Sequence, residues 1–97
     1  MKIEYDLAKN ERNIKERGLP FEKVYSLDWD DAIFWKDTRK EYGEDRVNVL
    51  ALMPCDEKLY AVTFTIRSDV TWIISFRRAN KRERKLYDEQ RNRSRKN

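Results

Sequence analysis

The chain has 97 residues, of which 41% are charged, and its net charge is +4. This length supports one modest core, so we expect residues 1–97 to form a single domain. The longest apolar stretch, within residues 62–76, is interrupted by Arg67 and Asp69 and falls short of the roughly 20 apolar residues of a membrane span. The N-terminus has no apolar signal segment, and the lone Cys55 cannot form an internal disulfide. These features predict a cytoplasmic protein.

Positive charge is concentrated towards the C-terminal end of the chain. Residues 77–97 hold 10 Lys or Arg and 3 Asp or Glu, whereas residues 1–76 hold 12 and 15. A basic segment of this density attracts RNA, DNA or an acidic protein, and salt weakens the attraction. The alternative is a solvated helix whose cations lie at its C-terminal end. We favour this alternative for residues 91–97, which could form a frayed basic tail.

The N-terminal residues predict a strand followed by a helix. Residues 2–5 alternate polar and apolar side chains, as in a strand. Asp6 can cap a helix that continues to about Arg17, where Gly18 and Pro20 end it. This helix has few apolar residues, so it should lie on the surface with four basic side chains largely solvated: Lys9, Arg12, Lys15 and Arg17.

The middle of the chain predicts a short helix, a short strand and a loop. Phe21, Val24 and Tyr25 recur at helical spacing over about two turns, and we expect all three in the core. Residues 32–35 are apolar enough for a short strand, and the polar residues 37–45 should form a loop.

Three further strands and a final helix complete the prediction. The strands cover residues 46–53, 59–66 and 70–76, and the short loops between them require an antiparallel meander. Asn80 with Glu83 three residues later indicates a capping box at the start of the helix. The apolar residues expected to pack from this helix are Leu86 and Tyr87. The fold class is therefore predicted as α+β with a three- to four-stranded antiparallel sheet.

Alternation along the last two strands predicts which side chains share a face of the sheet. The expected apolar stripes are Tyr60, Val62, Phe64 and Ile66 in one strand, and Val70, Trp72, Ile74 and Phe76 in the other. The opposite sides hold Thr63, Thr65 and Arg67 in one strand, and Thr71, Ile73, Ser75 and Arg77 in the other. If the register brings these sides together, hydroxyls and two guanidiniums share a face suited to phosphate and 2′-hydroxyl groups.

The most informative segment is the strand end at residues 73–79, Ile-Ile-Ser-Phe-Arg-Arg-Ala. Its apolar residues lead directly into Arg77 and Arg78, and arginines at the edge of a buried sheet indicate a phosphate-facing site. The alternative is that these arginines only mark a strand that enters solvent.

Two spacings in the chain form a recognisable pattern. An Asp-x-x-Lys-x-x-x-Asn spacing begins at Asp6, and the Ile-Ile-Ser-x-Arg-x-Ala segment is followed by Glu83 and Tyr87. Further positions of the pattern are Ile3, Glu4, Tyr5, Lys15, Gly18, Phe21, Glu22, Arg46, Thr65 and Arg67. With this pattern, residues 3–88 resemble the BrnT toxin family. The resemblance implies a RelE-like compact α+β ribonuclease toxin of a type II toxin–antitoxin pair, and a small DNA-binding antitoxin that neutralises it and helps to repress their operon.

The chain also departs from the family pattern. It has Glu16-Arg17-Gly18 where family members commonly have Lys-His-Gly, and it contains no histidine. Apolar residues stand where polar or charged ones are common, at Phe64, Ile66 and Trp72. RelE-like toxins often use Lys, Arg and Tyr in place of a histidine pair, so the departures leave cleavage open.

The chemistry of RNA cleavage assigns candidate roles within this resemblance. Attack by a 2′-hydroxyl needs a proton acceptor, a proton donor for the leaving oxygen and cations for the charged phosphorane. The candidate catalytic residues are Arg67 and Arg77 as phosphate clamps, and Glu83 or Tyr87 for proton transfer. The candidate RNA- or phosphate-binding residues are Lys15, Arg17, Thr65, Ser75 and Arg78. Structural alternatives are helix capping for Glu83, packing for Tyr87, solvation for Lys15 and backbone bonding for Ser75.

Metal and cofactor chemistry is not expected. One cysteine and no histidine leave no plausible cluster for zinc or another transition metal. The acids Asp28, Asp30 and Asp31 are the one alternative, since carboxylates can gather a hard cation. Three carboxylates beside a loop are usually only exposed, and we favour that interpretation.

Two functional hypotheses remain open. The first is a metal-independent endoribonuclease toxin, which arrests growth until an antitoxin covers its basic face; Arg67, Ser75 and Arg77 favour it. The second is a binding module of the same fold that has lost cleavage, which the apolar departures favour. The expected partners are a cognate antitoxin, RNA, and operator DNA only through the antitoxin complex.

Overall fold

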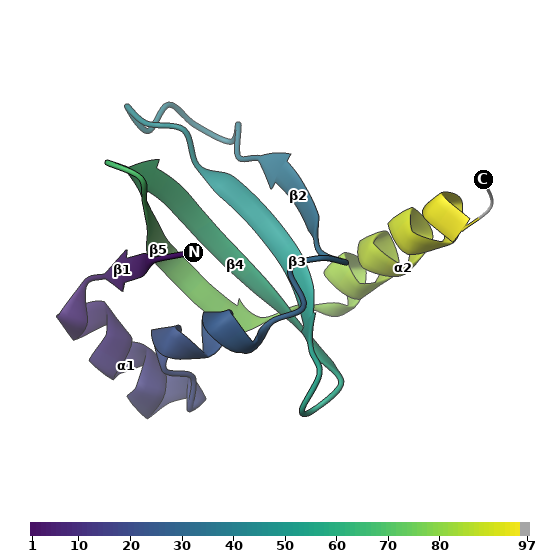
Figure 1. Ribbon diagram of the computed structural model, residues 1–97, viewed down its shortest axis with the longest axis horizontal. Helices are drawn as coiled ribbons and strands as arrows, with labels where there is room; N and C mark the ends of the chain where they lie inside the picture. The colour runs from purple at the N-terminus through teal and green to yellow at the C-terminus, as the bar shows by residue number, and fades with distance from the viewer. Residues whose placement is uncertain (96–97) are drawn as a thin grey trace.

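The molecule is built on a five-stranded sheet with helices on opposite sides (Figure 1). The computed structural model describes residues 1–95, with side chains through residue 93. In chain order the elements are β1 (Ile3–Tyr5), α1 (Leu7–Arg17), the 3-10 helix η1 (Phe21–Ser26), β2 (Ile33–Lys36), β3 (Val47–Met53), β4 (Lys58–Arg67), β5 (Val70–Arg78) and α2 (Lys81–Arg95). The predicted α+β class is confirmed. Over residues 1–95, no helix is long and apolar enough to cross a bilayer.

The sheet order is β1-β5-β4-β3-β2, and the predicted antiparallel meander is formed by β2 to β5. The sheet has more strands than expected and is mixed, because β1 pairs in parallel with residues 71–73 of β5. This pairing joins segments nearly 70 residues apart in the sequence. Local alternation identifies such a strand but does not reveal its partner.

The helix ends follow the predicted capping chemistry. Asp6 accepts a hydrogen bond from the backbone N–H of Lys9 at 3.0 Å, and Gly18 ends α1 with a φ of 67°, a left-handed conformation that favours glycine. At α2, the N–H of Glu83 donates to Asn80 Oδ1 at 2.8 Å, and the N–H of Asn80 donates to Glu83 Oε1 at 2.9 Å. The predicted capping box is confirmed.

The second helix differs from the prediction in its winding. With about three residues per turn in a 3-10 helix, Phe21 and Val24 fall on one side and are buried. Tyr25 turns away and is 50% exposed, so its expected place in the core is wrong. Its hydroxyl instead accepts a hydrogen bond from the N–H of Ile3 at 2.9 Å, which ties η1 to the start of β1.

The two faces of the sheet are covered unequally. The main core lies on the face under α1 and η1 and includes Val24, Val49, Val62, Ile73 and Phe76. A smaller apolar cluster lies on the other face, where Tyr87 of α2 packs with Leu50, Leu59 and Ala61. Because α2 covers only one end of this second face, the rest of that face holds polar side chains such as Thr63 and Ser75 together with Trp35 and Trp72.

A β-bulge in β5 corrects the predicted assignment of faces. Thr63 lies opposite Ser75 and Phe64 lies opposite Ile73, so Ile74 is an extra residue without a partner in β4. Ile73 and Thr71 therefore join Phe76 on the core face, whereas Val70 and Trp72 join Ser75 and Arg77 on the other. The predicted stripe of Tyr60, Val62, Phe64 and Ile66 does share one face.

For the C-terminal segment, the structure agrees up to residue 95 with the favoured solvated helix and not with a frayed tail. Residues 91–95 of the expected tail are helical, and Arg91 forms an ion pair with Asp31 at 2.7 Å. Residues 96–97 lie outside the described residues.

Candidate active site

A polar hollow of about 180 Å³ opens on the sheet face opposite α1. Strands β2 to β5, the loop after β2 and the first turn of α2 all contribute to it. Its polar and aromatic lining residues are Trp35, Arg39, Asn48, Thr63, Ser75, Arg77 and Glu83. We call it the arginine hollow. The sheet and α2 therefore bring together side chains that are far apart in the sequence.

Arg77 is held at one side of the arginine hollow by two parallel hydrogen bonds. Its Nη1 and Nη2 donate to Oε1 and Oε2 of Glu83 at 2.8 and 2.9 Å. The hydrogen bond to Glu83 raises the pKa of Arg77, against the opposing effects of burial and of the nearby Arg39 charge. The same bond lowers the pKa of Glu83. Both groups are therefore charged at neutral pH, in a fixed orientation.

A second guanidinium, that of Arg39, reaches the same hollow from the loop after β2. Asp37 accepts hydrogen bonds from Nε and Nη2 of Arg39 at 2.9 and 2.7 Å, and from the Tyr42 hydroxyl at 3.3 Å. The bond from Arg39 is the largest cause that lowers the pKa of Asp37 well below its ordinary range. Asp37 is 5% exposed, so its carboxylate is a buried anchor that positions the exposed Arg39.

The floor of the arginine hollow is a row of short polar side chains across three strands. The register places Asn48 opposite Thr63 and Thr63 opposite Ser75. The Thr63 hydroxyl donates to Asn48 Oδ1 at 2.8 Å. Two guanidiniums above a floor of hydroxyl and amide groups match what a phosphodiester needs, because arginine binds phosphate oxygens in pairs and hydroxyls add further donors.

The family comparison decides the class of protein. Residues 5–83 match the family model described as ribonuclease toxin, BrnT, of type II toxin–antitoxin system. The chain belongs to this family. The chain has no match among curated proteins.

Two residues of the family pattern stabilise the fold and do not line the arginine hollow. Asp6 caps α1. Asn13 is 4% exposed, and its Nδ2 donates to the backbone oxygens of Leu19 and Phe76, both at 2.9 Å. It thereby joins the end of α1 to β5. Two residues of the Asp-x-x-Lys-x-x-x-Asn spacing thus hold the fold together.

Arg67, expected beside Arg77, lies at the far end of the same face. Arg67 is opposite Val70 and Arg77 is opposite Ala61. The two positions are therefore six residues apart along β4, a distance of about 20 Å at strand spacing. Arg67 is paired with Glu44 at 3.1 Å and lies over the ring of Trp72. The structure does not bring Arg67 into the arginine hollow.

The other predicted site residues separate into those near the arginine hollow and those elsewhere. Ser75 and Glu83 line it. Tyr87 is 2% exposed, between α2 and the sheet, and its hydroxyl has no hydrogen-bond partner among the described residues. Thr65 is equally buried and donates to the backbone oxygen of Asp45 at 2.6 Å. Arg78 lies over the ring of Tyr60, opposite it in β4.

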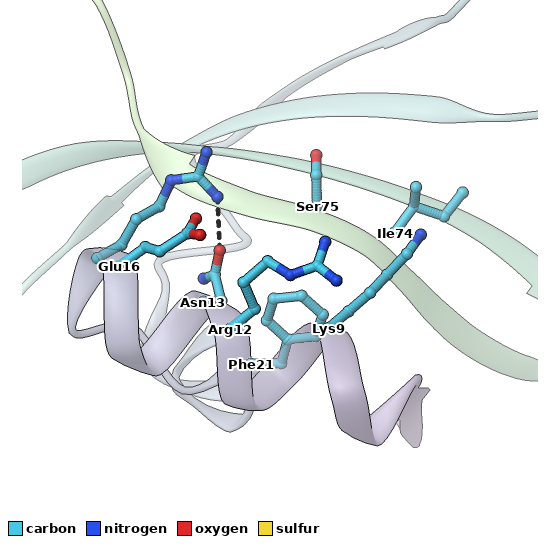
Figure 2. A pocket seen from close by; sticks show the side chains of 8 residues that line it. Lys9, Arg12, Asn13, Glu16, Phe21, Ile74 and Ser75 are labelled. Carbon is cyan, nitrogen blue, oxygen red and sulfur yellow. Dashed lines mark hydrogen bonds between the residues drawn. The ribbon is translucent and has the colours of Figure 1, made fainter.

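The two residues predicted from α1 differ from each other. Arg17 donates to Asn13 Oδ1 at 2.6 Å and lines a second hollow of about 150 Å³, between α1 and β5 (Figure 2). Lys15 is exposed and lines neither hollow. Lys9 and Arg12, expected to be largely solvated, also line the second hollow.

The sequence analysis missed Trp35, Asp37, Arg39 and Asn48. Trp35 lies in a strand too short to show alternation. Asp37 and Arg39 lie in the segment that the sequence predicts as a polar loop. The Asp-x-Arg spacing at Asp37 is the one local signal, because an aspartate often bonds to residues two positions on. Over residues 1–95, no three His, Cys, Asp or Glu side chains are grouped to hold a metal ion.

Proposed function

We propose that the chain is the toxin of a type II toxin–antitoxin pair and cleaves RNA at the arginine hollow without a metal. The observation that carries this proposal is the pair of guanidiniums around one polar hollow, with Arg77 fixed by Glu83 and Arg39 fixed by Asp37. Both arginines are positioned by carboxylates before any substrate binds. Such preorganised cations are the main means of stabilising a charged transition state.

The proposed reaction is attack by a ribose 2′-hydroxyl on the adjacent phosphate, which forms a 2′,3′-cyclic phosphate. The bond to the 5′-oxygen of the next nucleotide breaks, and this oxygen takes a proton from water. The phosphate lies between Arg39 and Arg77, which stabilise the additional negative charge of the phosphorane. Ser75 and Thr63 lie below it and can contact the phosphate or the 2′-hydroxyl. The planar side chain of Trp35 gives a base of single-stranded RNA a surface on which to stack.

Glu83 is the proposed proton acceptor. Its Oε1 accepts from Arg77 and from the Asn80 N–H, whereas Oε2 accepts, among the described residues, only from Arg77. A carboxylate oxygen has two acceptor positions, so Oε2 can also take a hydrogen bond from a 2′-hydroxyl. Its lowered pKa keeps Glu83 ionised at neutral pH. Tyr87, the other residue considered for proton transfer, is assigned to packing because it is buried between α2 and the sheet.

The position of the apolar departures favours cleavage over a binding module that has lost it. Phe64 is opposite Ile73, and Ile66 is opposite Thr71, on the core face of the sheet. Phe64 packs edge-on against Trp29 there. Polar residues at these two positions would not point into the arginine hollow. Trp72 does share the face of Arg77, but it lies under Arg67 at the other end.

The proposal extends to partners and cell biology. A toxin that cleaves RNA arrests growth and requires a cognate antitoxin, and the net charge of +4 suits an acidic antitoxin segment. We place the toxin in the cytoplasm, where its RNA substrate lies. Operator DNA is contacted only through the DNA-binding antitoxin.

The test is cleavage of a labelled single-stranded RNA by the wild type and by Arg77→Ala. We expect kcat/KM to fall at least tenfold, a loss of about 1.4 kcal/mol of transition-state stabilisation. Arg82→Ala is the matched control, because Arg82 is an exposed arginine of α2 that does not line the arginine hollow. Equal cleavage by all three proteins would point to a contaminating ribonuclease and contradict the proposed site.

A further inference from the structure

The second hollow, between α1 and β5, is rich in positive charge. Lys9, Arg12 and Arg17 line it, with Glu16 as its one acidic residue. Figure 2 shows the side chains of Lys9 and Arg12 extending from α1 towards β5. We call it the helix hollow. Three cations against one carboxylate give it a positive charge, and an anion is the ligand that suits it.

The helix hollow is formed by regular secondary structure rather than by flexible loops. Lys9, Arg12 and Glu16 follow the three- and four-residue spacing that places side chains on one face of a helix. The same face carries Asn13, whose side-chain amide binds the backbone of β5 at Phe76. Because this buried bond fixes α1 against the strand, the cations have a defined place beside β5.

Ser75 connects the two hollows. It lines the helix hollow and the arginine hollow alike. The two are therefore neighbours across β5, at the position of the bulge. The pairing of β1 with β5 ends at Ile73, so within the described residues the outer edge of β5 beside Ile74 and Ser75 has no strand partner. A bound linear ligand that crosses this edge passes from Lys9 and Arg12 in the helix hollow to Arg77 and Arg39 in the arginine hollow.

We propose that the helix hollow is a second phosphate subsite, which binds single-stranded RNA beside the phosphate held in the arginine hollow. This inference rests on the proposed function, since it extends the same RNA path over Ser75. Repeating phosphates match cations spread over two adjoining hollows. An acidic protein segment is the other ligand class, and the test separates it.

The experiment measures binding rather than cleavage, with a short single-stranded RNA made uncleavable by 2′-O-methyl groups. Fluorescence anisotropy gives its affinity over a salt series for the wild type and for the Lys9→Ala/Arg12→Ala variant. Alanine suits both helical positions, so α1 should persist. Lys23→Ala is the control for the loss of a surface cation, because Lys23 is exposed on η1 and lines neither hollow.

We expect the double variant to reduce the slope of log affinity against log salt by about 1.4, since each phosphate contact on a single strand contributes about 0.7. The affinity gap to the wild type then widens about sevenfold as salt falls from about 200 to about 50 mM. Lys23→Ala should leave most of the slope intact. Cleavage by the double variant should show a raised KM, because a binding contact away from the reacting bond has been lost.

Three outcomes would overturn the subsite. One is an unchanged slope in the double variant while Arg77→Ala abolishes cleavage, which leaves the proposed ribonuclease standing. Another is the absence of measurable RNA binding by the wild type. The third is weaker binding of a purified cognate antitoxin with unchanged RNA affinity, which would assign the helix hollow to that partner. The expected slope with no cleavage by the wild type would instead support the subsite and contradict the ribonuclease.

Discussion

Arg77 and Arg67 lie on the same face of the sheet, and a glutamate holds each of them, yet their surroundings differ. Arg77 is bonded to Glu83 beside a second guanidinium and a polar floor, in a hollow of about 180 Å³. Arg67 is paired with Glu44 across an exposed hairpin end and lies on Trp72. An ion pair with a glutamate therefore does not by itself distinguish a candidate active site. The residues that enclose Arg77 distinguish it from Arg67, because charges act more strongly where water is partly excluded.

Replacing Glu83 or Glu44 by glutamine, each in its own variant, should produce the largest contrast between the two ends of this face. Glu83→Gln removes the proposed proton acceptor, and general base catalysis is worth about 10²- to 10⁴-fold, so we expect kcat for RNA cleavage to fall at least a hundredfold. Glu44→Gln should change kcat by less than about twofold, because it removes no contact to the transition state. Glutamine still completes a capping box, so α2 should keep its start in the first variant.

The pH profile separates catalysis by Glu83 from simple positioning of Arg77. Hydrogen bonds from Arg77 lower the pKa of Glu83, so the wild type should keep its proton acceptor ionised until the pH falls below the ordinary range of a glutamate. An acid limb of kcat/KM in that low range should be present in the wild type and absent in Glu83→Gln. If both proteins show the same limb and differ only in KM, Glu83 positions Arg77 and does not accept the proton.

The ends of the helices and the hairpins could be predicted from residues close together in the sequence. Asp6 and Gly18 mark the ends of α1, and Asn80 with Glu83 marks the start of α2, because caps depend on residues three or four positions apart. The hairpins are similarly local. The Arg67-Ser68-Asp69 turn requires positive φ at two residues, 50° at Ser68 and 65° at Asp69, and such tight turns join antiparallel strands.

The site required information that local patterns do not contain. The bulge at Ile74 shifts the alternation of β5 by one residue. Residues 70–73 therefore lie on the opposite faces from those that strict alternation with residues 75–77 predicts. Arg39 follows Asp37, whose N–H bonds to the backbone oxygen of Arg46, nine residues away and just before β3. Neither feature has a periodic signal, so the sequence alone put Trp72 on the wrong face and did not identify Arg39 as a site residue.

Asp37→Asn should give an intermediate effect at the Arg77 end of the face. Its carboxylate holds Arg39, so we expect the variant to raise KM for RNA several-fold while kcat changes less. The variant should also lose about 1–2 kcal/mol of stability at pH 7, because a buried charged hydrogen-bond acceptor is replaced. Urea unfolding followed by tryptophan fluorescence measures this loss, and RNA titration measures KM.

The sign of the pH dependence follows from the pKa of Asp37, which is lower in the folded state than in the unfolded chain. The ionised form is therefore favoured by folding. Its stabilisation is complete above the unfolded-state pKa and is lost as pH falls through the lower folded-state value. The stability difference between the wild type and Asp37→Asn should thus shrink below about pH 4. A difference that grows with acid would contradict the buried anchor.

Arg67→Ala should have the smallest effect and completes the comparison of the two ends. The Arg67 side chain is 47% exposed, and an exposed ion pair contributes about 0–1 kcal/mol, with a similar contribution from a cation on an exposed aromatic ring. We expect a stability loss within about 1 kcal/mol that decreases as salt is added, since salt screens the pair with Glu44. RNA cleavage should stay within about twofold of the wild type. A loss of cleavage comparable to that of Arg77→Ala would show that both ends of this face contact the reacting RNA, and that a single hollow is too small a description of the site.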